Sequence, residues 1–278
     1  MNLSIVVVHY KSPKLLTQCI KSILEKYPEL KGNFVIVDNS PNLKISKQIK
    51  KTFPKERYIP SKVNVGFAKG VNWGINNTTT EYVMILNPDI VMQDLAIEKM
   101  LNYMEKHKDV ALIAPKLIYG DGTVQESCYR FHNSILTVAY RRTFLGKMSF
   151  AKKELKKFTM ADYDHKKTKE VDWVLGACMM VRKKAIEEVG LMDERFFLYL
   201  EDVDWCRRFW ENGWKVIYFP LAQMSHFYKR ESAEKMGFIS FFNKMTRIHI
   251  KSGVKYFWKH RKKKESPREI YKRAIQQK

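Results

Sequence analysis

The sequence predicts an α/β fold, with a mostly parallel central sheet and helices on both of its faces. Two observations lead to this prediction. Short apolar, β-branched runs typical of buried strands alternate with helical patterns over residues 1–115, and this order of elements is characteristic of parallel sheets covered by helices. Polar residues also gather directly after the strands, at the edge where open α/β sheets bind their ligands.

The individual elements follow from apolar periodicity and from turn residues. Buried strands are expected at 3–10, 34–37, 82–86 and 111–114. Helices are expected to begin after Ser12-Pro13 and to cover 44–53, 66–76 and 94–107. Farther along, strand character returns at 173–181 and 216–219, and residues 203–210 have a helical pattern.

Composition limits the class of protein. The 278 residues and 45% apolar content are enough to form the core of one large domain. The four cysteines lie far apart, which argues against a zinc site or a disulfide framework and favours a reduced, cytoplasmic compartment. The N-terminus lacks the basic region of a signal peptide, and no apolar run reaches the ~20 residues of a spanning helix. Any membrane contact is therefore expected to be peripheral.

The net charge of +22 implies an anionic partner, which is a nucleic acid, an anionic membrane surface or a phosphorylated substrate. Much of this charge lies in two segments. Residues 141–169 hold ten cations and three acids, which predicts an exposed, mobile insertion, and residues 239–278 hold thirteen cations and two acids. We therefore expect one large domain at 1–236, with halves at 1–115 and 116–236, and a basic helical tail at 237–278.

Two acidic segments are candidates for chemistry. Asn87-Pro88-Asp89 ends a predicted strand and can present oxygen ligands to Mg²⁺ or Mn²⁺, although the same residues suit a simple turn. Asp202 falls on the apolar face of a predicted helix, so it either caps the helix or has a function. Beside it, Asp204 is expected to form a surface ion pair with Arg207 and Arg208.

Two further features can contribute to a site. His226 follows a predicted strand, where a lone histidine is either structural or a ligand. Glycines at the mouth of the helix that follows Asn64 allow backbone N–H groups to approach a phosphate or a base, or allow the helix to pack closely on the sheet. Their spacing differs from that of dinucleotide-binding and P-loop motifs.

Together these pieces resemble the family-2 glycosyltransferases of the GT-A fold, a Rossmann-like architecture, and especially the bacterial rhamnosyltransferase-like branch. The resemblance extends from Leu3 to about His226. The motifs that carry it are Val8-His9-Tyr10-Lys11, Val37-Asp38-Asn39-Ser40, Asn64-x-Gly66-Phe67-Ala68-x-Gly70-x-Asn72, Leu86-Asn87-Pro88-Asp89, Trp173-Val174-x-Gly176-Ala177, Phe196-Phe197-x-x-x-Glu201-Asp202-x-Asp204-x-Cys206-x-Arg208 and His226.

The resemblance implies a role for each site residue. The donor nucleotide would be bound by Tyr10, Asp38, Asn64, Gly66, Phe67 and Gly70. Asp89 would be the main ligand of Mg²⁺ or Mn²⁺, His226 would complete the coordination, and Asn87 would replace the family's first Asp as a weaker ligand beside the donor. Trp173, Gly176 and Glu201 would lie at the acceptor, and Asp202 would be the catalytic base.

The implied reaction is chemically consistent. A divalent cation stabilises the charge that grows on a nucleoside diphosphate leaving group, and a carboxylate takes the proton of the acceptor hydroxyl. One base, one metal and in-line attack give inversion at the anomeric carbon. The first expectation for the donor is dTDP-rhamnose, with a UDP-hexose as the alternative, and the acceptor is expected to be a glycan, including one on a polyprenyl diphosphate carrier.

Two other classes of protein would also explain parts of the sequence. A nucleic-acid binder would explain the charge, but no zinc finger, RNA-recognition signature or oligonucleotide-binding pattern is present, so no nucleic-acid partner is expected. A nucleotidyltransferase would share the strand-end acids and the metal. It would also need phosphate-binding Lys or Arg residues beside the first strand, where only Lys11 and Lys14 follow, without a glycine-rich stretch.

The basic tail predicts a membrane contact. An apolar face is expected on Phe238, Phe241, Phe242, Met245 and Ile248, and a cationic stripe is expected on Lys244, Arg247, Lys251 and Lys255. Such a helix suits an anionic leaflet, which would place the protein in the cytoplasm on the inner face of the plasma membrane. The alternative is that the apolar face packs on the large domain.

Overall fold

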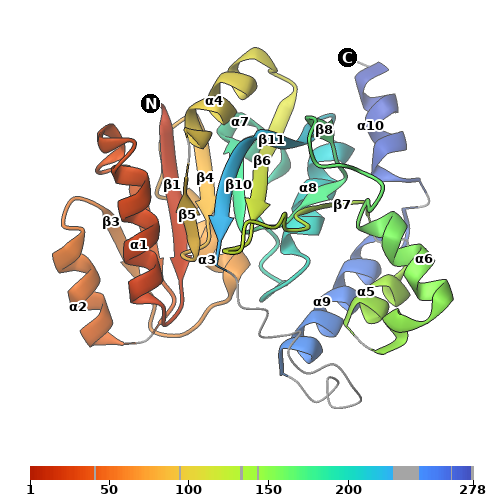
Figure 1. Ribbon diagram of the computed structural model, residues 1–278, viewed down its shortest axis with the longest axis horizontal. Coiled ribbons are helices and arrows are strands. Elements are labelled where there is room, and N and C mark those ends of the chain that lie inside the picture. The colour runs from red at the N-terminus through yellow and green to blue at the C-terminus, as the bar shows by residue number, and fades with distance from the viewer. Residues whose placement is uncertain are drawn as a thin grey trace.

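The computed structural model describes residues 1–276 except positions 41, 94, 132, 133, 143, 228–243 and 264. Its centre is a nine-stranded sheet in the order β3-β2-β1-β4-β10-β6-β11-β5, with β8 paired to β11 (Figure 1). The strands of this sheet are β1 (Leu3–His9), β2 (Phe34–Asp38), β3 (Arg57–Pro60), β4 (Tyr82–Leu86), β5 (Ile90–Met92), β6 (Val110–Ile118), β8 (Lys169–Glu170), β10 (Cys178–Arg182) and β11 (Lys215–His226). A smaller sheet joins β7 (Cys128–Tyr129) to β9 (Trp173–Val174).

Helices cover both faces of the large sheet. The α-helices are α1 (Pro13–Leu24), α2 (Leu43–Thr52), α3 (Phe67–Ile75), α4 (Ala96–Lys106), α5 (Ile135–Arg142), α6 (Ser149–Phe158), α7 (Lys183–Val189), α8 (Glu201–Glu211), α9 (Lys244–His260) and α10 (Pro267–Gln276). On β1, Ile5 and Val7 belong to the core that includes α1 and α4, while Val6 and Val8 belong to the core that includes α3 and α8. Both faces of this strand are buried, which explains its continuous apolar run.

The sheet is parallel where strands and helices alternate, and mixed beyond that region. The strands β3, β2, β1 and β4 pair in parallel, as the sequence predicts. By contrast, β10 runs antiparallel between β4 and β6, and β11 is parallel to β6 but antiparallel to β5. The sequence does not predict β3, because this edge strand is largely exposed and has no apolar run, or β5, which has only three residues.

The carboxyl ends of β1, β2 and β4 meet at one edge of the sheet, the lower edge in Figure 1. His9 and Asp38, the last residues of β1 and β2, lie in register. On the other side of the edge, Ile90 of β5 pairs with His226 of β11, and Phe227 N donates to Asp89 O at 2.9 Å. This antiparallel pairing places Asp89 beside His226, although the two residues are far apart in the chain.

The segment 141–169 contains a helix and buried residues, which its high charge does not predict. It contains α6, whose lysines are exposed but whose Ala151 and Phe158 are buried. Arg141, counted among the exposed cations of this segment, lies against two aromatic rings. The segment is therefore not exposed throughout, because a few apolar residues anchor it to the core, and its mobility stays a prediction.

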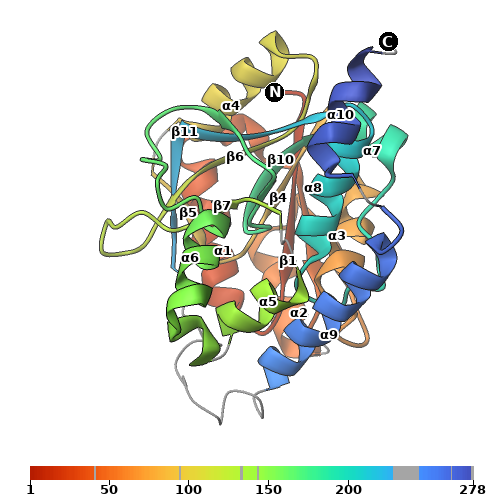
Figure 2. The same ribbon diagram turned by 90° about the vertical axis from the view of Figure 1, so that its right-hand side faces the viewer.

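The described part of the basic tail packs on the body of the protein. Figure 2 shows α9 alongside α5, and α10 alongside α8. The buried face of α9 is polar or small rather than apolar, and consists of Thr246, His249, Ser252, Gly253, Tyr256 and His260. Of the predicted apolar face, Met245 and Ile248 are half-buried, and Phe238, Phe241 and Phe242 lie outside the described residues.

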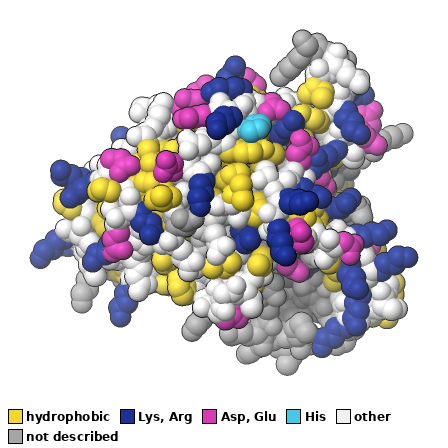
Figure 3. Space-filling model, turned by 45° about the horizontal axis from the view of Figure 1, so that its top comes forward, with side chains coloured by type: hydrophobic (Ala, Val, Ile, Leu, Met, Phe, Trp, Pro, Cys, Tyr) yellow, Lys and Arg dark blue, Asp and Glu magenta, His cyan; other side chains and the backbone are white. Residues whose placement is uncertain are grey.

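The predicted cationic stripe of α9 is exposed. Lys244, Arg247, Lys251 and Lys255 all have exposed side chains. On the face in Figure 3, basic side chains are interspersed with acidic and apolar ones, so the positive charge does not form one continuous stripe there. Among the described helices, none combines the length and apolar character that a bilayer crossing requires.

A buried ionic cluster joins α8 to α9. Asp204 is fully buried rather than at the surface, and its oxygens lie 2.9 Å from Arg208 Nε, 2.6 Å from Lys259 Nζ and 2.9 Å from His260 Nε2. Burial raises the pKa of Asp204, but His260, Arg208 and Lys259 outweigh this and lower it to about 2. The expected surface pair with Arg207 is wrong, because α9 covers this side of α8.

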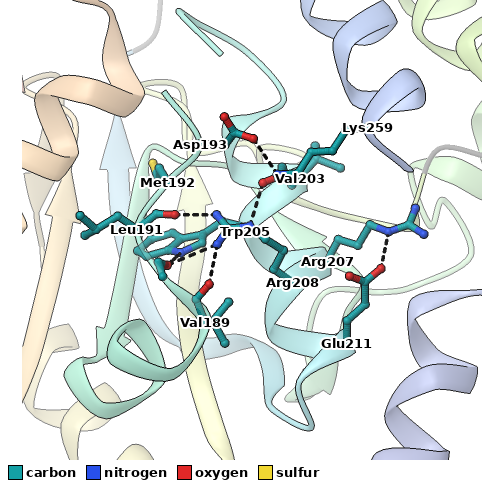
Figure 4. A network of polar contacts seen from close by, with 12 residues as sticks. Val189, Leu191, Met192, Asp193, Val203, Trp205, Arg207, Arg208, Glu211 and Lys259 are labelled. Carbon is teal, nitrogen blue, oxygen red and sulfur yellow. Dashed lines mark hydrogen bonds and ion pairs between the residues drawn. The ribbon is translucent and has the colours of Figure 1, made fainter. Parts of the chain in front are cut away.

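Figure 4 shows how the cations of this cluster reach other segments. Arg208 donates to the backbone oxygens of Val189 and Leu191 at 3.0 and 2.7 Å, and Lys259 lies 2.7 Å from Asp193. Arg207 instead pairs with Glu211 at 2.8 Å. The cluster therefore links α8, α9 and the chain that leads from α7 toward α8.

We expect Asp204→Asn to destabilise the fold by about 3–5 kcal/mol, because it removes the buried carboxylate that Arg208, Lys259 and His260 share. Since the folded-state pKa of Asp204 is depressed to about 2, its stabilisation is present above about pH 4 and is lost as the pH falls toward 2. Urea unfolding of the wild type and the variant across this pH range measures both effects. Asp162→Asn, at an exposed position, is the control and should change stability by less than ~0.5 kcal/mol.

Candidate functional site

The candidate site lies at the carboxyl edge of the sheet, where strand ends meet two loops. One loop precedes α3 and the other precedes α8. The two loops touch, because Phe67 N donates to Phe197 O at 2.8 Å. Residues from both halves of the chain are thereby brought to the same edge.

Asp38 is the centre of a buried hydrogen-bond cluster on the β1–β2 side of this edge. It has no exposed surface; its Oδ1 lies 3.0 Å from His9 Nε2 and accepts from Ser40 N at 2.9 Å. Its Oδ2 accepts from Ser46 Oγ at 3.0 Å and from the Tyr58 hydroxyl. Burial raises the pKa of Asp38, but the bonds from His9 and Tyr58 outweigh this and lower it to about 2. The carboxylate is therefore ionised and engaged on both oxygens.

This engagement limits how Asp38 can act on a nucleotide. A direct contact, as the resemblance implies, requires that the nucleotide replace one of the four donors. Tyr10 is different, because it is 47% exposed just beyond the end of β1. Its ring has the free surface that stacking on a base requires.

Asn39 holds the loop before α3 in place. Its Nδ2 donates to Gly66 O and its Oδ1 accepts from Val65 N, both at 2.9 Å. Asn64 Oδ1 accepts from Gly66 N at 2.9 Å. Gly66 has a φ of +89°, and a Cβ at this position would lie 2.4 Å from Phe197 O. Only glycine allows both this turn and the contact with the loop before α8.

Gly70 has a structural explanation. A Cβ there would lie 2.9 Å from Val8 Cγ1, and a Cβ at Gly74 would lie 2.1 Å from Val6 Cγ1. The two glycines thus let α3 pack closely on β1, which is the alternative that the sequence left open for Gly70. A contact between Gly70 and the nucleotide stays a prediction.

Asp89 and His226 face each other at the other side of the edge. His226 Nε2 lies 3.3 Å from Asp89 Oδ1, and His226 Nδ1 lies 2.8 Å from Gln125 Oε1. Because the amide oxygen of Gln125 is an acceptor, Nδ1 carries the proton in this contact, and in the neutral imidazole the lone pair then lies on Nε2. Two acceptors then point at each other, and Asp89 Oδ1 is a buried atom without a hydrogen-bond donor. This arrangement fits a shared cation.

The fit to a divalent metal rests on these two ligands. Histidines that bind metals usually donate their second ring N–H to an oxygen acceptor, and Gln125 supplies that acceptor. Within the described residues no group of three or more His, Cys, Asp or Glu converges on one point. Substrate phosphates and water would therefore have to complete the coordination, as is usual for Mg²⁺. Asn87 contributes its backbone here, since Asn87 N donates to Ala177 O at 2.8 Å, and a metal contact by its side chain stays a prediction.

Asp202 lies at the start of α8 and is 7% exposed. Its Oδ2 accepts from Gly176 N at 3.0 Å and its Oδ1 accepts from Val203 N at 2.8 Å. Burial raises the pKa of Asp202 to about 6, although these backbone bonds and the charge of Arg141 oppose the rise. A carboxylate with such a pKa is suited to take a proton near neutral pH.

Glu201 and Trp173 occupy supporting positions next to Asp202. Glu201 is buried, and burial together with the charge of Asp202 raises its pKa well above its usual range. Trp173 is 4% exposed, stacks on Tyr129 at 4.3 Å between ring centroids, and donates Nε1 to Arg130 O at 2.8 Å. The indole therefore has little surface for an acceptor, and a Cβ at Gly176 would contact Asp202 at 3.5 Å. Their acceptor contacts stay predictions.

The residues just before Asp202 have a strained backbone that α9 holds. Tyr199 and Leu200 have φ of +71° and +64°, a conformation that costs about 1–3 kcal/mol at each non-glycine residue. Ser252 Oγ donates to Leu198 O at 2.9 Å, and the His249 ring lies 4.6 Å from the Tyr199 ring. Sequence periodicity did not identify this role, because the contacting face of α9 is polar.

Gln125 and Arg141 are further site residues that the sequence did not single out. Gln125 is buried in the segment between β6 and β7 and belongs to no motif. Arg141 was hidden among the cations of the insertion. They are identified only in the structure, where Gln125 contacts His226 and the charge of Arg141 acts on Asp202.

Comparisons with known proteins agree with this geometry. The family model described as "Glycosyl transferase family 2" matches residues 4–190. An N-acetylglucosaminyl-diphospho-decaprenol L-rhamnosyltransferase of Mycobacterium tuberculosis is 24% identical over 251 residues, which cover 81% of this chain and 75% of that protein. The rhamnosyltransferase WbbL of Escherichia coli (strain K12) is 24% identical over 254 residues, which cover 87% of this chain and 89% of that protein.

A solved structure shows the same fold. The crystal structure of GalNAc-T7 with UDP, GalNAc and Mn²⁺ superposes with a TM-score of 0.63 at 12% identity and covers 94% of this chain. The chain spans about half the length of that protein, 49%. The likeness confirms the GT-A fold that the sequence predicts.

We expect Gln125→Ala to weaken Mn²⁺ binding by roughly 10- to 100-fold, because His226 loses the acceptor that orients it. Asp89→Asn should weaken binding more strongly, since it removes a charged ligand. Electron paramagnetic resonance of free Mn²⁺ in a titration with saturating UDP measures both. Gln18→Ala, at an exposed position, is the matched control, and wild-type affinity in Gln125→Ala would show that His226 needs no such support.

Proposed function

The chain belongs to glycosyl transferase family 2, and from this premise we propose that it is an inverting, metal-dependent hexosyltransferase that uses dTDP-rhamnose. The acceptor is a hydroxyl of a glycan, carried on a polyprenyl diphosphate, in the synthesis of a cell-surface polysaccharide. The observation that carries the proposal is Asp202, a buried carboxylate with a pKa of about 6 at the edge where Asp89 and His226 meet.

The proposed mechanism needs one base. Asp202 takes the proton of the acceptor hydroxyl as its oxygen bonds to the anomeric carbon of the donor, and the bond from that carbon to the diphosphate breaks. The attacking and leaving oxygens lie on opposite sides of the carbon, so the configuration inverts without a covalent intermediate. The bonds from Gly176 N and Val203 N keep the carboxylate of Asp202 in one orientation during this step.

Asp89 and His226 are the residues that would hold Mg²⁺ or Mn²⁺. The cation would supply Lewis-acid stabilisation of the leaving diphosphate. The donor nucleotide would lie beside Tyr10 and the loop from Asn64 to Phe67, with the Asp38 cluster beneath it. The mechanism therefore divides the site into a donor side on β1 and β2 and an acceptor side at α8.

The choice of sugar and carrier rests on the relatives. Two of them are named as rhamnosyltransferases, and one of these names includes a diphospho-decaprenol acceptor. Another relative, from Haloferax volcanii, is named as a hexosyltransferase of low-salt glycan biosynthesis. A hexose from a UDP-sugar is therefore the second candidate for the donor.

A peripheral membrane location follows from this choice of acceptor. The exposed face of α9 carries Lys244, Arg247 and Lys251, and Trp258 on the same helix is 66% exposed. Cations with exposed tryptophan suit the headgroup region of an anionic leaflet. We propose that α9 both packs on the protein and rests on the inner face of the plasma membrane.

If Asp202 is the base, Asp202→Asn should lower kcat by roughly 10²- to 10⁴-fold and leave the affinity for the donor unchanged. In the wild type, kcat/KM should rise with pH through about 6, because the base must lose its proton before it can act. Steady-state kinetics from pH 4.5 to 8 measures both. Near wild-type turnover in Asp202→Asn would contradict the assignment of Asp202 as the base. Asp162→Asn serves as the control.

The donor proposal predicts a preference for pyrimidine nucleotides. With Mn²⁺ present, dTDP and UDP should bind at least about 10-fold more tightly than ADP and GDP, and calorimetric titration measures this. Mass spectrometry of a lipid-linked glycan after incubation with dTDP-rhamnose then tests transfer itself. A purine preference would contradict the donor, and transfer from a UDP-hexose alone would favour the second candidate.

The membrane proposal predicts binding to vesicles that contain anionic lipid. Each surface cation contributes about 1 kcal/mol, so replacing Lys244, Arg247 and Lys251 by Gln should weaken binding roughly 100-fold. Sedimentation with vesicles at low and high salt measures this. The matched control replaces three other exposed lysines, which are Lys21 on α1, Lys26 in the turn after α1 and Lys47 on α2. An equal loss of vesicle binding in both variants would show that the attraction is non-specific. If the α9 variant sediments as the wild type does, α9 does not contact the membrane.

A further inference from the structure

Arg141 is an enclosed cation on the acceptor side that the mechanism above does not use. Its guanidinium carbon lies 4.4 Å from the centre of the Tyr129 ring and 5.2 Å from that of Phe158. Arg141 Nη2 donates to the Tyr129 hydroxyl at 2.8 Å. Protein atoms surround the guanidinium, yet the residue keeps some surface open to solvent. The guanidinium is therefore largely enclosed by protein but can still be reached from solvent.

The hydrogen bonding of Arg141 is incomplete. A guanidinium has five N–H donors, and the part of the chain that the structure describes satisfies one of them, through a neutral hydroxyl. No carboxylate of that part lies within ion-pair distance of Arg141. An enclosed cation without a paired anion is costly, so it is expected where a ligand brings the anion.

The charge and rigidity of Arg141 suit an anionic ligand. Burial lowers its pKa, but the contact with Tyr129 and the charges of Glu126 and Asp202 outweigh this and raise it, so the group stays charged. The two rings and the hydrogen bond fix the plane of the guanidinium. A fixed, planar guanidinium with free donors is the group that best binds phosphate with two parallel hydrogen bonds.

The position of Arg141 selects which phosphate it would bind. The acidic groups that act on it most strongly are Glu126 and Asp202, which lie on the acceptor side. Tyr129, on which it stacks, pairs with Trp173 in the small sheet, and the chain leads from there to Gly176, the residue that donates to Asp202. The donor diphosphate already has Asp89 and His226 on the other side of the edge.

We propose that Arg141 forms a phosphate subsite for the acceptor, which binds the diphosphate of a lipid-linked sugar while Asp202 receives the proton of that sugar's hydroxyl. This inference rests on the proposed function. It adds that the protein distinguishes a diphosphate-linked acceptor from a neutral glycan through one residue, by a charge contact next to the base.

A direct binding measurement tests the subsite without requiring turnover. The probe is a short-chain prenyl diphosphate, titrated calorimetrically with UDP and Mn²⁺ present so that the donor site is filled. Arg141→Gln should weaken binding at least 10-fold, and Arg141→Lys should be intermediate, because lysine keeps the charge but loses the planar fork. Lys157→Gln on α6, which removes an exposed cation, should bind as the wild type does. Equal binding by the wild type and Arg141→Gln, or equal loss in Lys157→Gln, would overturn the proposal.

A kinetic comparison separates the subsite from a direct effect on Asp202. One acceptor is a sugar on the short-chain prenyl diphosphate, and the other is the same sugar on an uncharged octyl group. Measured at pH 8, well above the pKa of about 6 of Asp202, so that loss of a nearby charge changes the ionisation of the base little, Arg141→Gln should raise KM for the first acceptor at least 10-fold more than KM for the second. An equal fall in kcat with both acceptors would overturn the proposal, since Arg141 would then act through the base. Absence of transfer by the wild type to either acceptor would refute the proposed function, and the binding measurement would still decide the subsite.

Discussion

The site depends on the burial of three carboxyl groups within one turn of α8. Glu201, Asp202 and Asp204 are all buried, and a buried carboxylate is stable only where donors or cations replace water. Each residue meets this constraint differently. Asp204 has three cationic or histidine partners and Asp202 has two backbone N–H groups. Glu201 differs, because burial and the adjacent charge of Asp202 favour its protonated, uncharged form.

These environments give the three carboxyl groups different pKa values. The pKa of Asp204 is lowered to about 2, that of Asp202 is raised to about 6, and that of Glu201 is raised well above its usual range. One group is thus an anion that holds α9, one is a base that can accept a proton near neutral pH, and in the third burial and the charge of Asp202 favour the protonated form. Groups that titrate far apart in a single site are the usual basis for dividing acid, base and structural roles. The fold therefore assigns roles that three acids of the same type would not otherwise have.

The sequence predicted the half of the fold in which strands are continuous apolar runs and helices have a periodic apolar face. Strands such as β1 and β4 have buried residues on both faces, so they read as continuous apolar runs. The edge strand β3 and the polar face of α9 gave no such signal. Residues 1–115 also do not reveal that β10 inserts antiparallel between β4 and β6, because strand order is set by contacts between distant segments.

The same limit applies to the site. The proximity of Asp89 and His226 was implied by the family resemblance, and the antiparallel pairing of β5 with β11 supplies its physical reason. Gln125 could not be found from the sequence, since its role is to accept a hydrogen bond from a histidine that is distant in the chain. Asp38 shows the opposite case, in which a predicted ligand-binding group is fully engaged by His9, Ser40, Ser46 and Tyr58.

Charge illustrates why counting residues does not locate function. The net charge of +22 arises mainly from exposed lysines and arginines, each of which is solvated and contributes little to any single contact. Arg141 adds one unit to that total, but it is enclosed by rings and next to the base. Removal of water strengthens the interaction of such a cation with a phosphate, because the local dielectric constant falls. The exposed cations therefore suit attraction to a surface, whereas Arg141, which has no carboxylate partner among the described residues, suits recognition of a particular group on a substrate.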